Sequence, residues 1–331
     1  MKNNKQINYS LELLRLLLSF WVVIIHCYRY AFIFEKGKFP VPTFMIISFY
    51  FYYNILKKKN IIKIKQRFQR ILIPYIIWAI FLFIFNNALF ILFRFSLYYK
   101  KLLLRDLEIQ LIIGRKYHGI FYFQFILIFL TILMTIISFL FNKSSIFIFQ
   151  ALLIIAYIFQ YSYLNLYIFK EYPEYIKHSL GNIFELFPFA VMGIILHHLE
   201  IIKKLKQFKC LTIIYIVFII IFILKYNVFV RIKGFFYPGV LLNLGGNCIF
   251  ILFSLLSFQN KKLLFLLKIT TKFTGGIYYI HNECFNLLKR KFLFIKNKTI
   301  YGSTAIYIIS YIICFLGDKL TCKTKFKFLF N

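Results

Sequence analysis

The chain has 331 residues, of which 61% are hydrophobic and 22% aromatic, whereas only 16% are charged. A soluble domain averages about 45–50% apolar residues, so this composition excludes an ordinary soluble protein. The formal net charge of +32 could suggest a nucleic-acid partner. However, the cations stand in short segments between apolar runs, where Lys and Arg meet anionic lipid headgroups. We therefore predict an integral membrane protein with the lipid bilayer as its partner and no nucleic acid.

Apolar runs long enough to cross a hydrocarbon core of roughly 30 Å recur along the whole chain. Because a backbone in lipid must satisfy its own hydrogen bonds, each run is predicted to be a helix. The predicted spans, in chain order, are 11–33, 39–56, 71–93, 118–141, 146–169, 183–199, 210–230, 237–258, 273–288 and 299–317. The predicted fold class is an all-α integral membrane protein with about ten transmembrane helices in one bundle.

Connections between the spans carry few signs of further domains. The longest connection is 94–117, whose apolar patches predict a segment that lies at the membrane interface. We expect a single transmembrane domain over 1–331, with its core at 9–317 and no soluble accessory domain. The cysteines show no paired spacing, which predicts neither a disulfide framework nor a metal site.

The distribution of cations predicts the orientation in the membrane. The connection 56–70 reads LKKKNIIKIKQRFQR, with seven cations, and the C-terminal tail adds four more. Cations favour the cytoplasmic side, so both termini are predicted to be cytoplasmic in a multi-pass protein of the plasma membrane. The segment 289–298, KRKFLFIKNK, opposes this bias because it would face outward.

The first span carries a polar stripe, formed by Glu12, Arg15, Ser19 and His26. Arg15 and His26 are separated by ten residues, and eleven steps of about 100° return to nearly the same face of a helix. The two side chains would lie roughly 16 Å apart along the helix axis. An ionisable group within a span is costly and usually faces a cavity or a partner.

Two interpretations of this stripe remain open. In the first, Arg15 reaches the interface paired with Glu12, and His26 contacts water at the far end. In the second, the stripe faces a channel, with a cation for a phosphate-bearing donor at one end and a proton-transfer group at the other. Histidine suits proton transfer because its unperturbed pKa of about 6.5 lets it take and return a proton.

An Arg, ten residues and a His in the first of about ten spans resemble the acyltransferase 3 family of membrane O-acyltransferases. Further segments resemble this family's motifs in the expected order. They are VPTFMIISFYFYY (41–53), QRFQRILIPYIIW (66–78), YHGIFYFQFILI (117–128), FELFPFAVMGIIL (184–196) and GGIYYIHNECF (275–285). The resemblance extends from about residue 9 to 317 and adds its own expectations for the activity.

The resemblance implies an enzyme that transfers an acyl group, commonly acetyl, from acyl-CoA to a hydroxyl of an extracytoplasmic glycan or lipid-linked glycan. It implies His26 as general base or proton relay, and Arg15 as the residue that orients the donor. No tightly bound cofactor is expected, because acyl-CoA is a substrate. With no soluble domain to pass the acyl group onward, delivery would be direct or through a separate periplasmic or envelope protein.

Other polar residues are candidates for binding substrate. Arg67 and Arg70 suit the donor's phosphates, because guanidinium groups bind phosphate oxygens bidentately; ordinary anchoring at the cytoplasmic side is the alternative. Glu185 and His281 lie within spans, where they would line the acceptor's path or hydrogen-bond to another helix. Glu12 belongs to the polar stripe described above.

Ser48 and His118 are candidates through the resemblance alone, and both depart from the family pattern. Phe49 stands where the family has a Gly after this Ser, which puts a close backbone approach in doubt. The family's Trp near this His is absent, and aligning His118 needs a shift of one residue.

A transporter or flippase for a glycan or lipid-linked intermediate is the alternative function. Such proteins also have many spans and buried polar groups, and many contain internal repeats with helices broken at matching positions. The sequence shows no convincing repeat, and the polar stripe has no counterpart in the second half. An acyltransferase is therefore the favoured prediction.

Overall fold

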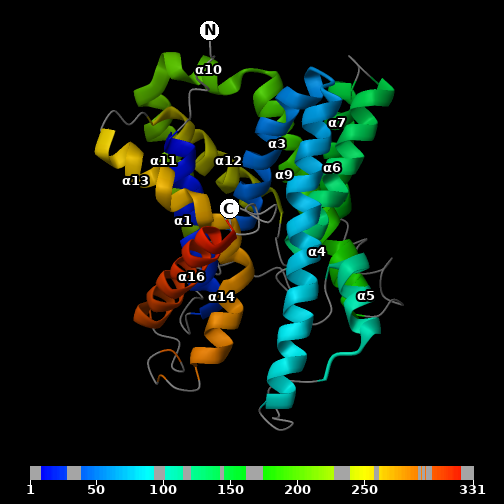
Figure 1. The fold of residues 1–331 in the computed structure, drawn as a ribbon. Helices are drawn as coiled ribbons and strands as arrows, with labels where there is room; N and C mark the ends of the chain where they lie inside the picture. The colour runs from blue at the N-terminus through cyan, green and yellow to red at the C-terminus, as the bar shows by residue number, and fades with distance from the viewer. Residues whose placement is uncertain are drawn as a thin grey trace. The chain divides into compact units, whose positions relative to one another are not determined.

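The protein is seen in a computed structural model. It describes residues 9–27, 39–92, 101–114, 121–141, 145–161, 174–226, 239–256, 261–289, 292, 295 and 300–321. Nearly all of these residues are helical, and none of them forms a strand (Figure 1). The predicted all-α class is confirmed for this part of the chain.

Five described helices are long and apolar enough to cross a membrane: Tyr9–Cys27, Ile61–Leu92, Phe121–Phe141, Gly181–His198 and Ile300–Thr321. Two shorter apolar helices, Ile146–Ile158 and Leu244–Leu255, accompany them. Every predicted span overlaps a described helix, while the number of about ten crossings stays a prediction.

The chain forms two compact units, and each is described by itself. Unit 1 comprises Met1–Phe51 and Phe189–Asn331, and unit 2 comprises Tyr52–Pro188. Unit 1 holds most of α3 (Pro40–Lys57) and the end of α9 (Glu174–His198). Its other described helices are α1 (Tyr9–Cys27), α10 (Ile201–Leu205), α11 (Lys209–Tyr226), α12 (Gly239–Leu255), α13 (Lys261–Thr270), α14 (Thr274–Leu288) and α16 (Ile300–Thr321). Short 3-10 turns follow α10 (η2, Lys206–Phe208) and α13 (η3, Thr271–Phe273).

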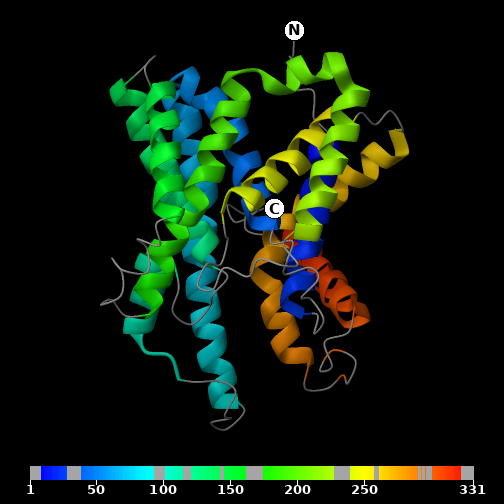
Figure 2. The same ribbon diagram turned by 180° about the vertical axis from the view of Figure 1, so that it is seen from behind.

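Helix α1 is the packing centre of unit 1. It contacts α12, α13, α14 and α16, which come from the C-terminal part of the chain (Figures 1 and 2). Ser10 Oγ, in the first turn of α1, donates a 2.6 Å hydrogen bond to the carbonyl oxygen of Leu256, the residue that follows α12. The N-terminal helix is therefore enclosed by segments that follow it by more than two hundred residues.

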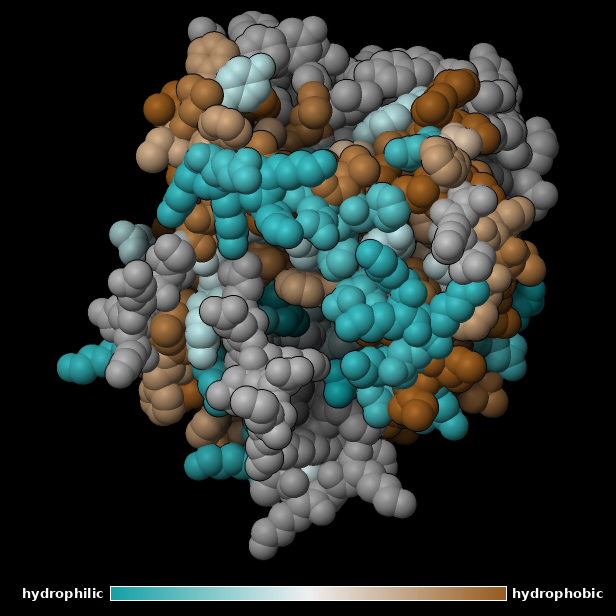
Figure 3. Space-filling view, turned by 90° about the horizontal axis from the view of Figure 1, so that it is seen from above, coloured by the Kyte–Doolittle hydropathy of each residue, from teal (hydrophilic) through white to brown (hydrophobic). Residues whose placement is uncertain are grey.

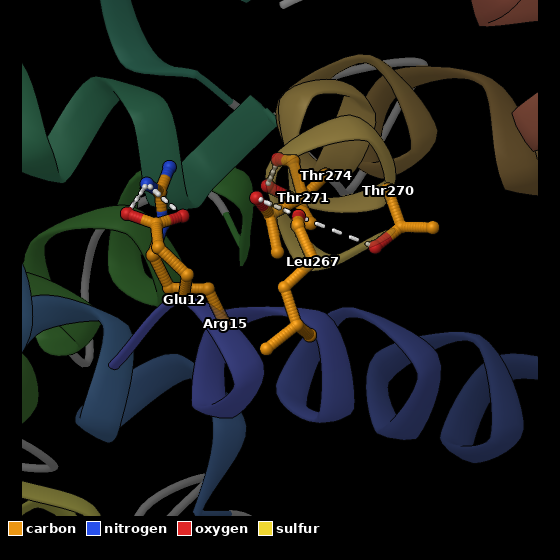
Figure 4. A network of polar contacts seen from close by, with 6 residues as sticks. All are labelled: Glu12, Arg15, Leu267, Thr270, Thr271 and Thr274. Carbon is orange, nitrogen blue, oxygen red and sulfur yellow. Dashed lines mark hydrogen bonds and ion pairs between the residues drawn. The ribbon is translucent and has the colours of Figure 1, made fainter. Parts of the chain in front are cut away.

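Helices α1 and α14 run in the same direction, and α16 runs in the opposite one. The first half of α1 lies beside η3, which leads into α14 (Figure 4), while His26 at the end of α1 lies beside His281 in α14. Lys272 of η3 forms an ion pair with Asp318 near the end of α16. These directions are relative to one another, while the side of the membrane that each helix end faces stays a prediction.

Unit 2 is organised around α4 (Ile61–Leu92), which packs against α5 (Leu104–Ile113) and α6 (Phe121–Phe141); α7 (Ser145–Tyr161) packs against α6. Tyr75 Oη donates to the carbonyl oxygen of Gln110 at 2.7 Å and so joins α4 to α5. Helix α5 ends at Gly114, whose φ of 75° favours glycine. The predicted interface segment 94–117 thus contains a short helix.

The connection predicted at 56–70 is mostly helical, because α4 begins at Ile61. Lys, Gln and Arg are good helix formers, and no Gly or Pro interrupts 61–70, so the helix continues past the apolar run. With 32 residues, α4 is about 48 Å long, which exceeds a hydrocarbon core of roughly 30 Å. The cationic turns therefore extend beyond the apolar part of the helix.

Cations also gather on unit 1. Lys203, Lys204 and Lys206, on α10 and η2, are exposed. Figure 3 looks at the molecule from the end at which α10 lies in Figure 1, and hydrophilic residues gather on this face. Such a face suits contact with water and lipid headgroups.

Candidate functional site

The polar stripe of α1 faces other helices of unit 1. Leu18 and Val22, which lie between Arg15 and His26 on nearly the same side of the helix, are 1% and 4% exposed. Leu17, on the opposite side, is 44% exposed. The continuous helix over Tyr9–Cys27 also supports the predicted alignment, since eleven residues return the chain to within about 20° of the same face.

Arg15 pairs with Glu12 at the first end of the stripe. Its Nη1 donates to both carboxylate oxygens at 3.3 Å (Figure 4), and the two side chains are 41% and 27% exposed. The pairing that the first interpretation predicted is therefore present. Because both contacts use one nitrogen, the described contacts leave the other guanidinium N–H groups available for an anion.

Three threonines surround the turn from α13 into α14, beside this pair (Figure 4). Thr270, Thr271 and Thr274 each donate their hydroxyl proton to a backbone carbonyl, over 2.7–3.1 Å. Their oxygens therefore present lone pairs, which do not attract an anion. Arg15 is thus the better anion-binding group at this end of the stripe.

Ser19, in the middle of the stripe, joins α1 to α16. Its hydroxyl donates to the carbonyl oxygen of Leu16 at 2.8 Å and lies 2.9 Å from Tyr307 Oη. Since the serine has only one proton to donate, the phenol of Tyr307 donates to Ser19. This residue pair is used for helix packing, and the sequence offered no signal for Tyr307.

His26 forms the second end of the stripe. Its side chain is exposed, and its ring centroid lies 5.3 Å from that of His281, with 39° between the ring planes. His281 lies on α14 and is 0% exposed. Two predicted site residues far apart in the sequence are therefore neighbours in unit 1, with one imidazole accessible and the other enclosed.

An apolar groove of about 400 Å³ lies between α1, α13 and α16. Leu16, Phe20 and Tyr311 line it, and His26 does not. Its wall suits an apolar chain, such as that of a lipid, and contains no histidine, carboxylate or cation. We therefore place the candidate chemistry at His26 and not in this groove.

Ser48 lies half-buried on α3 in unit 1. Phe49, which stands where the family has a glycine, is 0% exposed. Close helix approach is nevertheless present on α3, because Gly193 of α9 faces it: a Cβ added to Gly193 would lie 2.5 Å from the carbonyl oxygen of Ile46. Glycine permits such approach between membrane helices.

The remaining predicted residues belong to unit 2. The guanidinium of Arg67 lies 4.2 Å above the ring of Tyr52, whose hydroxyl donates to Thr135 Oγ1 at 2.6 Å. Arg70 is exposed on α4, and Glu185 is buried on α9. His118 lies outside the described residues.

Among the described residues of unit 1, the structure brings Glu12 together with Arg15 and His26 together with His281. The first follows from spacing along one helix, whereas the second depends on tertiary packing. The cation–π contact of Arg67 with Tyr52 was not predicted from the sequence. The sequence indicates only that a basic residue lies close to an aromatic-rich span.

Comparison with known proteins identifies the family. The family model named Acyl_transf_3, described as an acyltransferase domain, matches residues 8–318, nearly the whole chain. No curated protein and no solved structure matches the chain significantly. Together with the apolar helices, this match makes the chain a multi-pass membrane acyltransferase. The protein belongs to the acyltransferase 3 family.

Proposed function

We propose that the protein transfers an acyl group, acetyl in the first instance, from cytoplasmic acyl-CoA to a hydroxyl of an extracytoplasmic glycan or cell-envelope polymer. The plasma membrane is the proposed location, with both termini cytoplasmic. The donor would bind near Arg15, and the acceptor hydroxyl would approach His26.

The observation that carries this proposal is the exposed imidazole of His26 at one end of α1, with the partly exposed guanidinium of Arg15 at the other end. About 16 Å of helix separates the two residues. Acyl-CoA has its phosphates and its thioester at opposite ends of an extended pantetheine arm. A donor aligned along α1 would therefore place its phosphates and its reacting carbonyl near different ends of the helix.

The chemistry needs one group that moves a proton. As the acceptor oxygen attacks the thioester carbonyl, His26 removes the hydroxyl proton and becomes an imidazolium. The tetrahedral intermediate then expels the thiolate as the carbon–sulfur bond breaks. The thiolate takes the proton back, which leaves an ester, free CoA and a neutral His26. Arg15 would hold the donor's phosphates through charge-assisted hydrogen bonds.

Mass analysis of surface glycans tests this proposal in a host that lacks the gene. Wild type should add an acyl mass to the glycan, and His26→Ala and Arg15→Ala should not. His198→Ala, which removes a half-buried histidine of unit 1 outside the polar stripe, is the control and should behave as wild type. If both variants modify the glycan as wild type does, the proposed roles of His26 and Arg15 are wrong.

Labelled acyl-CoA separates this function from transport. An acyltransferase incorporates the label into the membrane fraction as an alkali-labile ester, whereas a flippase moves its substrate and forms no ester. Absence of label in membranes that contain folded wild-type protein would favour the transporter.

A further inference from the structure

The contact between His26 and His281 supports an inference that rests on the proposed function and assigns a part in it to the second histidine. His281 is 0% exposed, so it reaches neither solvent nor a substrate directly. Its ring nevertheless lies beside the exposed ring of His26, with centroids 5.3 Å apart. A buried polar side chain in this position needs a physical reason.

The hydrogen bond of one ring nitrogen determines the tautomer of His281. Nδ1 lies 3.0 Å from the carbonyl oxygen of Ile277, one turn earlier in α14. A carbonyl oxygen only accepts, so Nδ1 carries the proton and donates it. In the neutral ring, Nε2 is then a lone-pair acceptor.

The other ring nitrogen of His281, Nε2, indicates which partner the residue lacks. Nε2 of His281 is buried and has no hydrogen-bond partner among the residues that the structure describes. A buried acceptor without a donor is unfavourable. Rings with centroids 5.3 Å apart are close enough for facing nitrogens to reach hydrogen-bond distance when the exposed ring turns. His26 can therefore supply the missing donor.

We propose that His281 is a positioning residue for His26: its Nε2 accepts a hydrogen bond from a ring N–H of His26 and thereby holds that histidine in the reactive tautomer. The two nitrogens of an imidazole point in roughly opposite directions. With one N–H directed at His281, the other nitrogen of His26 is unprotonated and faces the exposed side, where the acceptor hydroxyl approaches.

The same hydrogen bond stabilises the intermediate state of the reaction. When His26 has taken the hydroxyl proton, both of its nitrogens carry hydrogen, and the positive ring donates to Nε2 of His281. This bond becomes charge-assisted and therefore stronger. His281 keeps its own proton on Nδ1 throughout, and the proton taken from the acceptor leaves with the CoA thiol.

A structural role for His281 makes a different prediction, because it depends on the other nitrogen. If the residue serves only the packing of α14, the bond from Nδ1 to Ile277 is what matters. The side-chain nitrogen of Asn can occupy the position of Nδ1, whereas the amide of Gln reaches the position of Nε2. His281→Asn and His281→Gln are therefore matched variants that separate the two roles.

The experiment measures labelled acyl transfer from acyl-CoA in membranes that contain wild type, His26→Ala, His281→Asn or His281→Gln. Size-exclusion elution in detergent confirms that each variant is folded. We expect His281→Asn to lower kcat by about 10- to 100-fold, since the reaction loses a hydrogen bond to a charged ring. The KM for acyl-CoA should stay unchanged, and His281→Gln should retain at least about a third of the wild-type kcat.

The other outcomes overturn the proposal. If Asn preserves activity and Gln does not, the Nδ1 bond is the important one and the role is structural. Equal retention, or equal loss in folded variants, shows that Nε2 has no special part. If wild type transfers no label, or His26→Ala transfers as much as wild type, the proposed function itself fails and the role of His281 falls with it.

Discussion

The polar residues of α1 differ in how much of their hydrogen-bonding capacity the fold already uses. Ser19 is fully engaged between Leu16 and Tyr307, whereas Arg15 contacts Glu12 through one nitrogen only. His26 is exposed beside a buried imidazole. Arg15 and His26 at the two ends of the stripe are therefore at least partly accessible to substrates, and Ser19 in its middle joins helices.

Glu12 is a candidate substrate-binding residue from the sequence, and its contact with Arg15 leads us to expect that it weakens donor binding. Its carboxylate lies 3.3 Å from Arg15, so it partly neutralises the guanidinium and repels phosphates. Glu12→Gln keeps the shape of the side chain and removes this charge. We expect the KM for acyl-CoA to fall by about two- to fivefold, the range for a partly exposed ion pair, with kcat little changed.

Steady-state kinetics with labelled acyl-CoA checks this result. Glu200→Gln is the matched control, because Glu200 pairs with Lys203 at the same spacing but with both side chains largely exposed. A higher KM in Glu12→Gln would mean that the carboxylate holds Arg15 in place for the donor.

The sequence predicted which segments form helices better than it predicted the residues at which each helix begins and ends. Long apolar runs can be satisfied only by helices in lipid, and every predicted span overlaps one. The start of α4 at Ile61 was missed because hydropathy marks where lipid contact ends, whereas the backbone stays helical until a breaker intervenes. The packing of α3 against Gly193 could not be predicted either, because a single sequence does not show which helices are neighbours.

Gly193 provides a test of this packing. A Cβ at this position would lie 2.5 Å from the Ile46 carbonyl oxygen and 3.0 Å from the Tyr50 nitrogen, which are backbone atoms with little freedom to move. Gly193→Ala should destabilise the protein by about 1–3 kcal/mol, seen as a lower melting temperature in detergent.

Gly181 of the same helix is the matched control. Nothing lies within 4 Å of a Cβ added there, so Gly181→Ala should be neutral or stabilise by up to about 1 kcal/mol through lower backbone entropy in the unfolded chain. Equal effects of the two variants would contradict the close approach of α9 to α3.

The ion pair between η3 and α16 should contribute to stability more than a surface pair does. Asp318 is 12% exposed and Lys272 38%, so Lys272→Met leaves a largely buried carboxylate without its cation. We expect a loss of about 1–3 kcal/mol, and a smaller loss when Asp318→Asn is added.

Lys203→Met is the control for the Lys272→Met variant. Lys203 and Glu200 also form an ion pair, but their side chains are 82% and 60% exposed. Lys203→Met should change stability by less than about 0.5 kcal/mol. Additive effects of Lys272→Met and Asp318→Asn in thermal unfolding would show that the two residues are not coupled.

For the molecule as a whole, the sequence predicted a membrane protein and an aligned Arg15 and His26, because both follow from local composition and helix geometry. The contact of His26 with His281 could not be predicted from one sequence. It joins residues of the first and ninth predicted spans, and periodicity carries no information about which spans are neighbours.

Orientation in the membrane is testable through one thiol. Cys210 is exposed at the start of α11, whereas Cys27, Cys248, Cys284 and Cys314 are buried. With the N-terminus cytoplasmic, Cys210 follows the sixth span and lies on the cytoplasmic side. A membrane-impermeant maleimide should therefore label the Cys322→Ser variant in inverted vesicles and not in intact cells.

The variant that combines Cys210→Ser with Cys322→Ser is the control and should take up no label in either preparation. Labelling of Cys210 in intact cells would reverse the predicted orientation. The donor site would then face outward, which is incompatible with cytoplasmic acyl-CoA.

The most direct test of the central claim is transfer across the membrane by inverted vesicles from the host. Labelled acyl-CoA is added outside, where the cytoplasmic face is exposed, and alkali-labile ester is measured on glycan in the vesicle lumen. We predict that wild type accumulates lumenal ester and that His26→Ala does not, at equal amounts of folded protein. Equal lumenal label in the two preparations, or label confined to the outer face, would contradict the account.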